Sequence, residues 1–283
     1  GWIILDKPLG LGSTQGVSAV KRALREGGYG PTKRDLPKVG HGGTLDPLAT
    51  GVLPIAIGEA TKLAGRMLDS DKVYDFTVKF GAETDTLDLE GQVIAESDVR
   101  PSRAEVETIL PRFTGPIDQV PPVYSALKVD GERAYDLARK GEEVTLASRA
   151  VTIRSLTLRE ATPESATFTA HVSKGTYIRS LARDIAHALG TVGHVTMLRR
   201  VKAGPFTLES AISLDKLVDA AKGRTLEHCL LPLRAGLDDI PALFLEPGQA
   251  GALRQGKVLT GIAADDGQHF ALEGDTPIAL VEA

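Results

Sequence analysis

The uneven order of strand-like and helix-like runs constrains the fold of this 283-residue chain most. Short apolar or alternating runs predict strands at residues 2–5, 52–58, 73–81, 150–159 and 165–172. Apolar residues at helical spacing predict helices at residues 14–26, 59–68, 102–113, 178–190 and 213–221. Because the two kinds of run do not alternate regularly, repeating βαβ units are excluded. We expect an α+β domain with a mixed, mainly antiparallel sheet and flanking helices.

Two further segments differ from this main body. Residues 119–144 combine prolines, tyrosines and basic side chains with little core-forming pattern, which is typical of an excursion from a domain. Residues 241–283 are Gly-rich with short β-like runs, and we expect a small separate barrel there. The predicted division is therefore a main domain over residues 1–235, with an insertion at about 119–144, and a small β-rich unit over residues 241–283.

Several classes of protein are excluded by what the sequence lacks. The single cysteine, Cys229, rules out an internal disulfide framework and a Cys-based zinc site. No run approaches the roughly 20 apolar residues of a membrane helix, and GWIILDKPLG has no signal-peptide pattern. The sequence contains no HExxH and no phosphate-binding GxxxxGK[ST] motif. We expect a cytoplasmic protein that needs no metal and no cofactor.

Charge is distributed unevenly along the chain, whose formal net charge is −4. Residues 1–40 hold 7 Lys or Arg against 3 Asp or Glu, and residues 171–204 hold 6 against 1. These two basic segments would line one groove for a polyanion if the fold brings them together, or form two separate solvated faces. Charge alone does not separate these alternatives.

Asp46 lies in the stretch HGGTLDPLATGVL, between Leu45 and Pro47. An Asp before Pro often caps a turn. Here the nearby glycines would let a ligand approach the main chain, and apolar neighbours would keep the carboxylate from water and raise its pKa unless a cation pairs with it. A paired, desolvated carboxylate is a candidate nucleophile or base. His41, in the same stretch, is either a loop-stabilising donor or a ligand contact.

The segment KGTYIRSLARDIAHALG, residues 174–190, offers a cation for that carboxylate. Tyr177 and Arg179 lie where a glycine turn enters a predicted helix, so both side chains can point into a cleft. An arginine is poorly placed for the dipole at a helix start, which suggests a carboxylate partner elsewhere. An ordinary surface ion pair is the alternative. Arg183, four residues later, would share the same face.

Six segments in order resemble the TruB-type tRNA pseudouridine-55 synthases. They are LDKPLGLGS (5–13), VGHGGTLDPLATGVLPIAIGEATK (39–62), DKVYDFTVKFGAETDTLDLEG (71–91), PPVYSALKVDGERAYDLARKG (121–141), KGTYIRSLARDIAHALG (174–190) and LRRVKAGPF (198–206). The resemblance spans about residues 1–215. It departs at Gly12 and Gly42, where many members have threonine, and we expect extra loop freedom at both positions.

The resemblance implies a fold and an activity. The fold would be a sheet of the pseudouridine synthase type, with residues 119–144 as a thumb-like insertion that closes over the RNA and residues 241–283 as a small PUA-like domain. The activity would be the isomerisation of uridine-55 to pseudouridine in the T loop of tRNA, after the base is flipped out of the loop. We expect a monomer that acts on the tRNA T arm without an obligatory protein partner.

The resemblance also implies roles for individual residues. The catalytic residues would be Asp46, Tyr74 and Arg179. Asp46 would attack the sugar or the uracil, or stabilise a cationic or glycal intermediate; Arg179 would keep it ionised, and Tyr74, otherwise a core aromatic, would stack on the uracil and help remove the C5 proton. The substrate-binding residues would be His41, Tyr177, Leu198, Lys7, Pro8 and Asp88. Of these, His41 would occupy the space of the flipped base, and Lys7 with Pro8 would buttress the pocket.

Two other readings use the same residues. The chain could be a tRNA-binding and tRNA-folding module in which catalysis is secondary, because base flipping and loop closure remodel RNA without chemistry. It could also be a carbohydrate-active enzyme in which Asp46 and Asp88 form a carboxylate pair. The alternative for Asp88 is a turn residue or an RNA-loop contact. The carbohydrate-active reading also leaves the two basic segments without an explanation.

Overall fold

A computed structural model describes residues 1–30, 32, 34–125, 128–129, 132–141 and 144–283 of the chain. Among these residues, ten strands form one sheet. Eight of them follow the order β14-β1-β3-β12-β4-β11-β10-β7, and two short strands pair beside this path, β2 with β3 and β13 with β12. Its strands are β1 (Trp2–Lys7), β2 (Val39–His41), β3 (Ala49–Ile57), β4 (Lys72–Phe80), β7 (Gly115–Gln119), β10 (Arg149–Ala161), β11 (Ser165–Val172), β12 (Gly193–Ala203), β13 (Phe206–Thr207) and β14 (Ile212–Ser213). Only the pairs β1–β14 and β3–β12 are parallel in this described sheet. The predicted mixed, mainly antiparallel sheet is confirmed.

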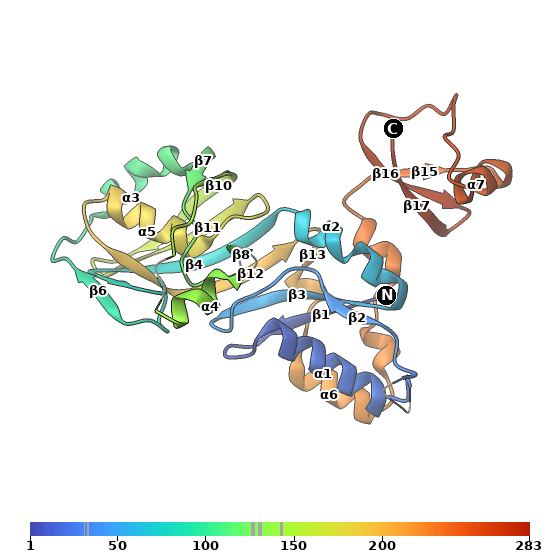
Figure 1. Cartoon of the computed structure of the whole chain (residues 1–283), viewed down its shortest axis with the longest axis horizontal. Helices are drawn as coiled ribbons and strands as arrows, with labels where there is room; N and C mark the ends of the chain where they lie inside the picture. Colours follow the sequence, from blue (N-terminus) through green and yellow to red (C-terminus); the bar gives the residue numbers. More distant parts are fainter. Residues whose placement is uncertain (31, 33, 126–127, 130–131, 142–143) are drawn as a thin grey trace.

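The helices of the described chain are α1 (Ser13–Glu26), α2 (Ala64–Asp69), α3 (Arg103–Ile109), α4 (Ala134–Arg139), α5 (Ile178–Ala188), α6 (Leu214–Lys222) and α7 (Pro247–Arg254). Two groups of helices pack on the sheet, α3 with α5 and α1 with α6 (Figure 1). Short 3₁₀ turns are η1 (Gly58–Leu63), η2 (Leu110–Phe113), η3 (Leu208–Ser210), η4 (Leu226–Cys229) and η5 (Leu233–Leu237). The helices expected at 14–26, 178–190 and 213–221 are present; the one expected at 59–68 is a 3₁₀ turn continued by α2. In the described part of the chain, no helix has the length and apolar character to cross a membrane.

Two hydrophobic clusters meet beside the centre of the sheet. Under α5, alternate residues of β4 and β11 are buried, and the rings of Phe76 and Phe168 stack with centroids 5.2 Å apart. Under α1 and α6, which lie side by side in Figure 1, a second cluster packs against β1 and β3. Tyr74 and Leu198 pack against both clusters. These two side chains therefore mark the junction at which a cavity opens.

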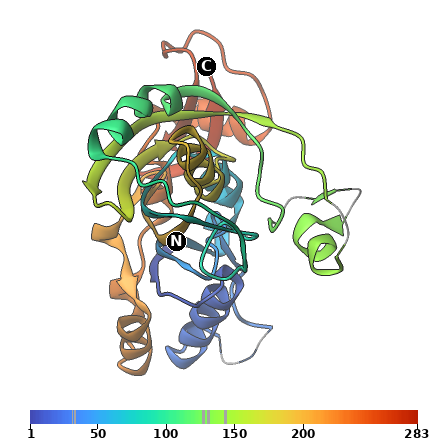
Figure 2. The ribbon, with the colours of Figure 1, turned by 90° about the vertical axis from the view of Figure 1, so that its left-hand side faces the viewer.

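The insertion leaves the sheet after β7 and returns at β10. It carries the two-residue strands β8 (Lys128–Val129) and β9 (Glu132–Arg133), followed by α4, and Figure 2 shows this part projecting from the body of the molecule. Gln119, the first residue of the predicted insertion, is instead the end of β7 and is buried. Residues 126–127, 130–131 and 142–143 of the predicted insertion lie outside the described residues, and its closure over RNA stays a prediction.

The C-terminal segment differs from the expected barrel. It holds a sheet of β15 (Ala242–Phe244), β16 (Gln268–Glu273) and β17 (Thr276–Glu282), together with helix α7, which the sequence analysis missed. The prediction of a closed barrel is wrong for the described residues, because β15 pairs only with β16 and β17 only with β16. Phe270 and Leu272 pack in one cluster with Trp2 and Met67 of the main body. The division between the units at residues 235–241 and the PUA-like assignment stay predictions.

A further pair of short strands, β5 (Ala82–Thr84) and β6 (Val93–Glu96), frames the acidic turn expected at residues 84–93. This turn leaves the end of β4 and lies beside the start of α5, as the bond from Arg179 Nη1 to the Thr86 carbonyl (3.0 Å) shows. The turn thus becomes one wall of the site described next.

Candidate active site

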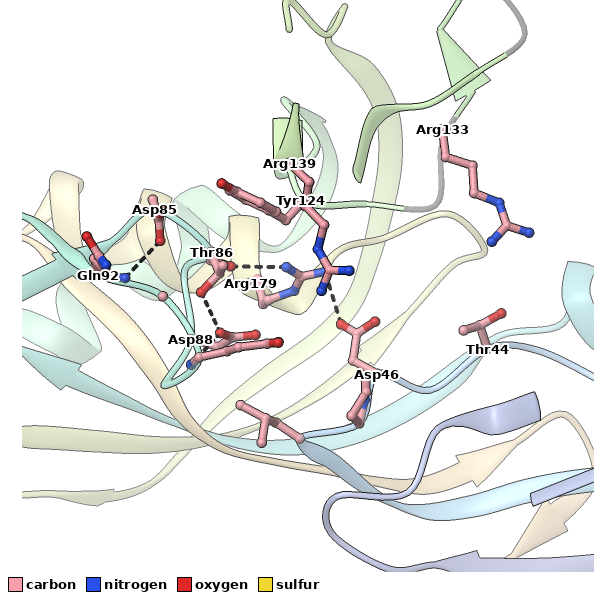
Figure 3. A pocket seen from close by; sticks show the side chains of 14 residues that line it. Thr44, Asp46, Asp85, Thr86, Asp88, Gln92, Tyr124, Arg133, Arg139 and Arg179 are labelled. Carbon is pink, nitrogen blue, oxygen red and sulfur yellow. Dashed lines mark hydrogen bonds and ion pairs between the residues drawn. The ribbon is translucent and has the colours of Figure 1, made fainter. Parts of the chain in front are cut away.

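The loop between β2 and β3 carries Asp46 to the mouth of the junction between the two hydrophobic clusters. The loop ends at Ala49, where β3 begins, and the Ala49 amide donates to the Asp46 carbonyl at 2.9 Å. Leu45 is buried in the cluster under α1, whereas Pro47 is exposed. The Asp46 carboxylate points toward Arg179 (Figure 3).

Arg179 lies in the first turn of α5 and reaches this carboxylate. Its Nη2 lies 3.0 Å from Asp46 Oδ2, and only 8% of its side chain is exposed. The predicted ion pair is confirmed. The expectation that Asp46 is kept from water is wrong for the protein alone, because 44% of its side chain is exposed. Apolar neighbours in the sequence do not desolvate an acid when one packs into the core and the other faces solvent.

A cavity of about 300 Å³ opens beside this pair. Its lining brings together Asp46, Tyr74, Tyr177, Arg179 and Leu198, all of which the sequence analysis selected. Leu198 on β12 pairs with Ala49 of β3, and Tyr74 lies on the neighbouring strand β4. Burial raises the pKa of the Tyr177 phenol, so this group stays protonated and able to donate a hydrogen bond. The cavity thus combines a carboxylate, an apolar wall and two aromatic rings.

Lys7, at the end of β1, supports the loop from below. It is fully buried, and its Nζ donates to the carbonyls of Pro8 (3.1 Å), Leu11 (2.5 Å) and Pro47 (3.4 Å). The pKa of the Lys7 ammonium is lowered to about 8, chiefly by burial; the Asp46 carboxylate opposes this shift, and the Arg200 guanidinium adds a smaller lowering. Lys7 thus holds main-chain carbonyls of the loop and of the turn before α1; that Lys7 and Pro8 buttress a substrate pocket stays a prediction.

Asp88 lies in the acidic turn, on the other side of Arg179. It accepts hydrogen bonds from Thr86 Oγ1 (2.6 Å) and the Glu90 amide (3.0 Å), as expected of a turn residue. It also lines a second cavity of about 480 Å³, shown in Figure 3, which Asp46 shares with Arg133 and Arg139 of the insertion. Asp88 therefore shapes the turn whose Thr86 carbonyl holds Arg179, and it faces the same opening.

His41 and Arg183 do not join this group in the described structure. His41 lies on β2 opposite Ile55 of β3, lines neither of these two cavities, and leaves its buried Nδ1 without a partner. Burial, followed by the Arg200 charge, lowers the pKa of its imidazole. Arg183 instead donates to the Val120 carbonyl at 3.0 Å. A role for His41 in RNA contact stays a prediction.

Two cavity-lining cations were missed from the sequence. Lys72 is buried and donates to the carbonyls of Met67 and Leu68, both at 2.8 Å, so it closes the end of α2. Arg200 is buried on β12, two residues after Leu198. The strand period offered a signal for Arg200, because alternate residues share one face of a strand. Within the described residues, no group of three or more His, Cys, Asp or Glu side chains is placed to hold a metal ion.

Comparisons with known proteins agree with this arrangement. The family model described as the TruB family pseudouridylate synthase N-terminal domain matches residues 32–178, which include the loop of Asp46 and the cavity wall of Tyr74. A second family model, described as the tRNA pseudouridylate synthase B C-terminal domain, matches residues 179–238. The chain belongs to the TruB family of pseudouridylate synthases.

Individual relatives cover the whole chain. The chain is 69% identical to tRNA pseudouridine synthase B of Novosphingobium aromaticivorans, with 100% of this chain and 93% of that protein aligned. For the Zymomonas mobilis protein of the same name the identity is 63%, with 100% and 91% aligned. The solved structure of a Cbf5-Nop10-Gar1 complex matches with a TM-score of 0.76 at 27% identity, covering 100% of this chain and 78% of that one.

The structure gives a reason for Gly42 other than the expected loop freedom. A Cβ atom on Gly42 would lie 2.5 Å from Met67 Cβ and 2.9 Å from Met67 Cγ. Met67 is fully buried, so neither atom can move aside easily. Gly42 therefore permits close packing of the loop on α2. Gly12 is different, because its Cβ would meet only the end of Gln15 at 3.5 Å.

We expect Gly42→Ala to lower the free energy of unfolding by about 1–3 kcal/mol, because overpacking a filled core strains its neighbours. Gly40→Ala is the matched control: it lies two residues earlier, on β2, and a Cβ there meets nothing within 4 Å. Denaturant unfolding of both variants measures the difference. Equal stability of the two variants would contradict the packing role of Gly42.

Proposed function

We propose that this chain isomerises uridine-55 in the T loop of tRNA to pseudouridine. The observation that carries the proposal is the ion pair between Asp46 and Arg179 at an open cavity, in a chain of the TruB family. The names of the relatives support the same substrate class. The half-exposed carboxylate suits this proposal, because a nucleotide that enters from outside must be able to reach it.

The isomerisation requires one bond to break and another to form. The bond between N1 of uracil and C1′ of the sugar breaks, the base turns within the cavity, and C5 bonds to C1′. The C5 proton leaves and N1 gains a proton, so the reaction needs no oxidant or reductant. We infer that Asp46 acts on the sugar or the base, and that the ion pair with Arg179 orients its carboxylate. Tyr74 would stack on the uracil and assist removal of the C5 proton, beside the apolar wall of Leu198.

Binding requires that the uridine leave the folded loop. Extruding a base costs a few kcal/mol, which contacts between protein and RNA must offset. We infer that exposed basic side chains of the two basic segments contact the RNA backbone, apart from Arg199, which pairs with Asp6, and the buried Arg200. We also infer that Tyr177, Lys7, Pro8, Asp88 and His41 shape the substrate site. The insertion would close over the T arm, and residues 241–283 would be a PUA-like domain. We expect a cytoplasmic monomer without an obligatory protein partner.

The test is tritium release from C5-labelled uridine in an unmodified T-arm stem-loop, incubated with the protein and excess chelator. We expect one tritium released per RNA, which establishes the activity and its independence of added metal. No release with tight RNA binding retained would overturn the proposal in favour of the tRNA-folding module. Hydrolysis of a chromogenic glycoside would instead support the carbohydrate-active alternative.

A further inference from the structure

The loop that carries Asp46 has no regular secondary structure between residues 42 and 48, yet donors from elsewhere in the chain hold its main chain. The Ser13 hydroxyl, at the start of α1, donates to the Leu45 carbonyl (2.9 Å) and accepts from the Leu45 amide (2.8 Å). The Gly10 amide donates to the Pro47 carbonyl at 2.8 Å. Irregular loops are usually mobile, so such contacts at successive residues need an explanation.

Arg200 holds both the loop and the strand that follows it. Its Nη2 donates to the Gly43 carbonyl (3.2 Å), its Nη1 to the Thr44 carbonyl (3.3 Å) and its Nε to the Val52 carbonyl (2.8 Å). One planar guanidinium thus joins the start of the loop to the strand that follows it. The Asp46 residue lies between these two attachment points.

Burying Arg200 is costly, which makes its position informative. The residue is 1% exposed, and no ion pair with a carboxylate is present among the described residues. Removing a charge from water is unfavourable unless hydrogen bonds compensate. Here the only compensation that the described contacts provide is the three loop and strand carbonyls. The planar fork of an arginine matches several fixed acceptors, which a lysine ammonium cannot do.

We propose that Arg200 and Ser13 are positioning residues, which hold the loop so that the Asp46 carboxylate stays in place for reaction. The inference rests on the proposed function and deepens it. The Asp46 side chain is half-exposed, so few neighbours besides Arg179 hold it in place. The position of its carboxylate therefore also depends on how firmly the main chain of the loop is held. Misplacing a catalytic group by about 1 Å costs on the order of 10²-fold in rate.

The main test compares Arg200→Met with Arg199→Met. Arg199 is the adjacent residue of β12, but it forms a half-exposed pair with Asp6 at 3.0 Å. We expect Arg200→Met to lower kcat about 10²-fold and Arg199→Met to stay within about threefold of the wild type. The Kd for a T-arm stem-loop should change less than about threefold in both variants, and Arg200→Lys should recover part of kcat because one donor remains.

Hydrogen exchange gives a readout that does not depend on activity. In Arg200→Met, the amides of Leu45 and Ala49 should exchange faster, while the amides of β4 and β11 stay protected as in the wild type. If Arg200→Met does not fold, Ser13→Ala carries the same two measurements, because it removes both bonds to Leu45 without leaving a buried charge.

Three outcomes would overturn the positioning role. These are an unchanged kcat, unchanged exchange at Leu45 and Ala49, or a loss confined to Kd with a shallower salt dependence. The last would make Arg200 a direct phosphate contact. Failure of the wild type to form pseudouridine would instead reject the proposed function, and the exchange result would still show whether Arg200 orders the loop.

Discussion

Asp46→Asn should reduce pseudouridine formation by about 10³-fold or more while the affinity for the T-arm stem-loop stays within about threefold of the wild type. Asparagine keeps the shape of aspartate but has neither the negative charge nor the nucleophilic oxygen. Because the Asp46 side chain is half-exposed at the cavity mouth, and Arg179 keeps its bond to the Thr86 carbonyl, the fold should be retained. Single-turnover tritium release and a binding titration measure the two effects separately.

Asp6→Asn is the matched control for this variant. Asp6 also pairs with an arginine, Arg199, at 3.0 Å, and its side chain is partly exposed. It lines none of the cavities that Asp46 lines. We expect Asp6→Asn to retain activity within about threefold. If Asp46→Asn still forms pseudouridine at the wild-type rate, the assignment of Asp46 is wrong.

Arg179→Ala should lower kcat by about 10²-fold, the second largest effect that we expect. The substitution removes the only cation paired with Asp46 in the described structure, together with the donor to the Thr86 carbonyl. The loss of stability should be smaller than for a fully buried pair, because Asp46 can still be hydrated once its partner is gone. Rates are measured alongside thermal unfolding, so that a loss of folded protein is not read as a loss of catalysis.

Arg100→Ala provides the comparison. Arg100 pairs with Glu164 at 3.1 Å on the surface, away from the cavities of Asp46. A pair of this kind is worth about 0–1 kcal/mol and should not affect the rate. Equal activity of Arg179→Ala and Arg100→Ala would reject a catalytic role for the pair with Asp46.

The errors in the expectations have a common physical origin. Helix α7 was missed because Gly248 and Gly251 lower its helix propensity, whereas Pro247 at its start and the burial of Ala250 favour it. Gly42 was expected to give the loop extra freedom, but the structure shows that a Cβ atom at this position would clash with Met67. In both cases a tertiary contact decided the outcome against the weight of the local pattern.

The sequence by itself determined the order of most strands and helices, the α+β class and the segments that carry the chemistry. The order and the class follow because burial of one face imposes a period of 2 or 3.6 on neighbouring residues, whereas the roles of the chemical segments follow from their resemblance to a known family. Only the tertiary structure decided which distant segments meet. Parallel pairing of β3 with β12 sets Leu198 opposite Ala49 and places Arg200 beneath the loop of Asp46, while α5 brings Arg179 to its carboxylate. These contacts depend on sheet topology, which local periodicity does not encode.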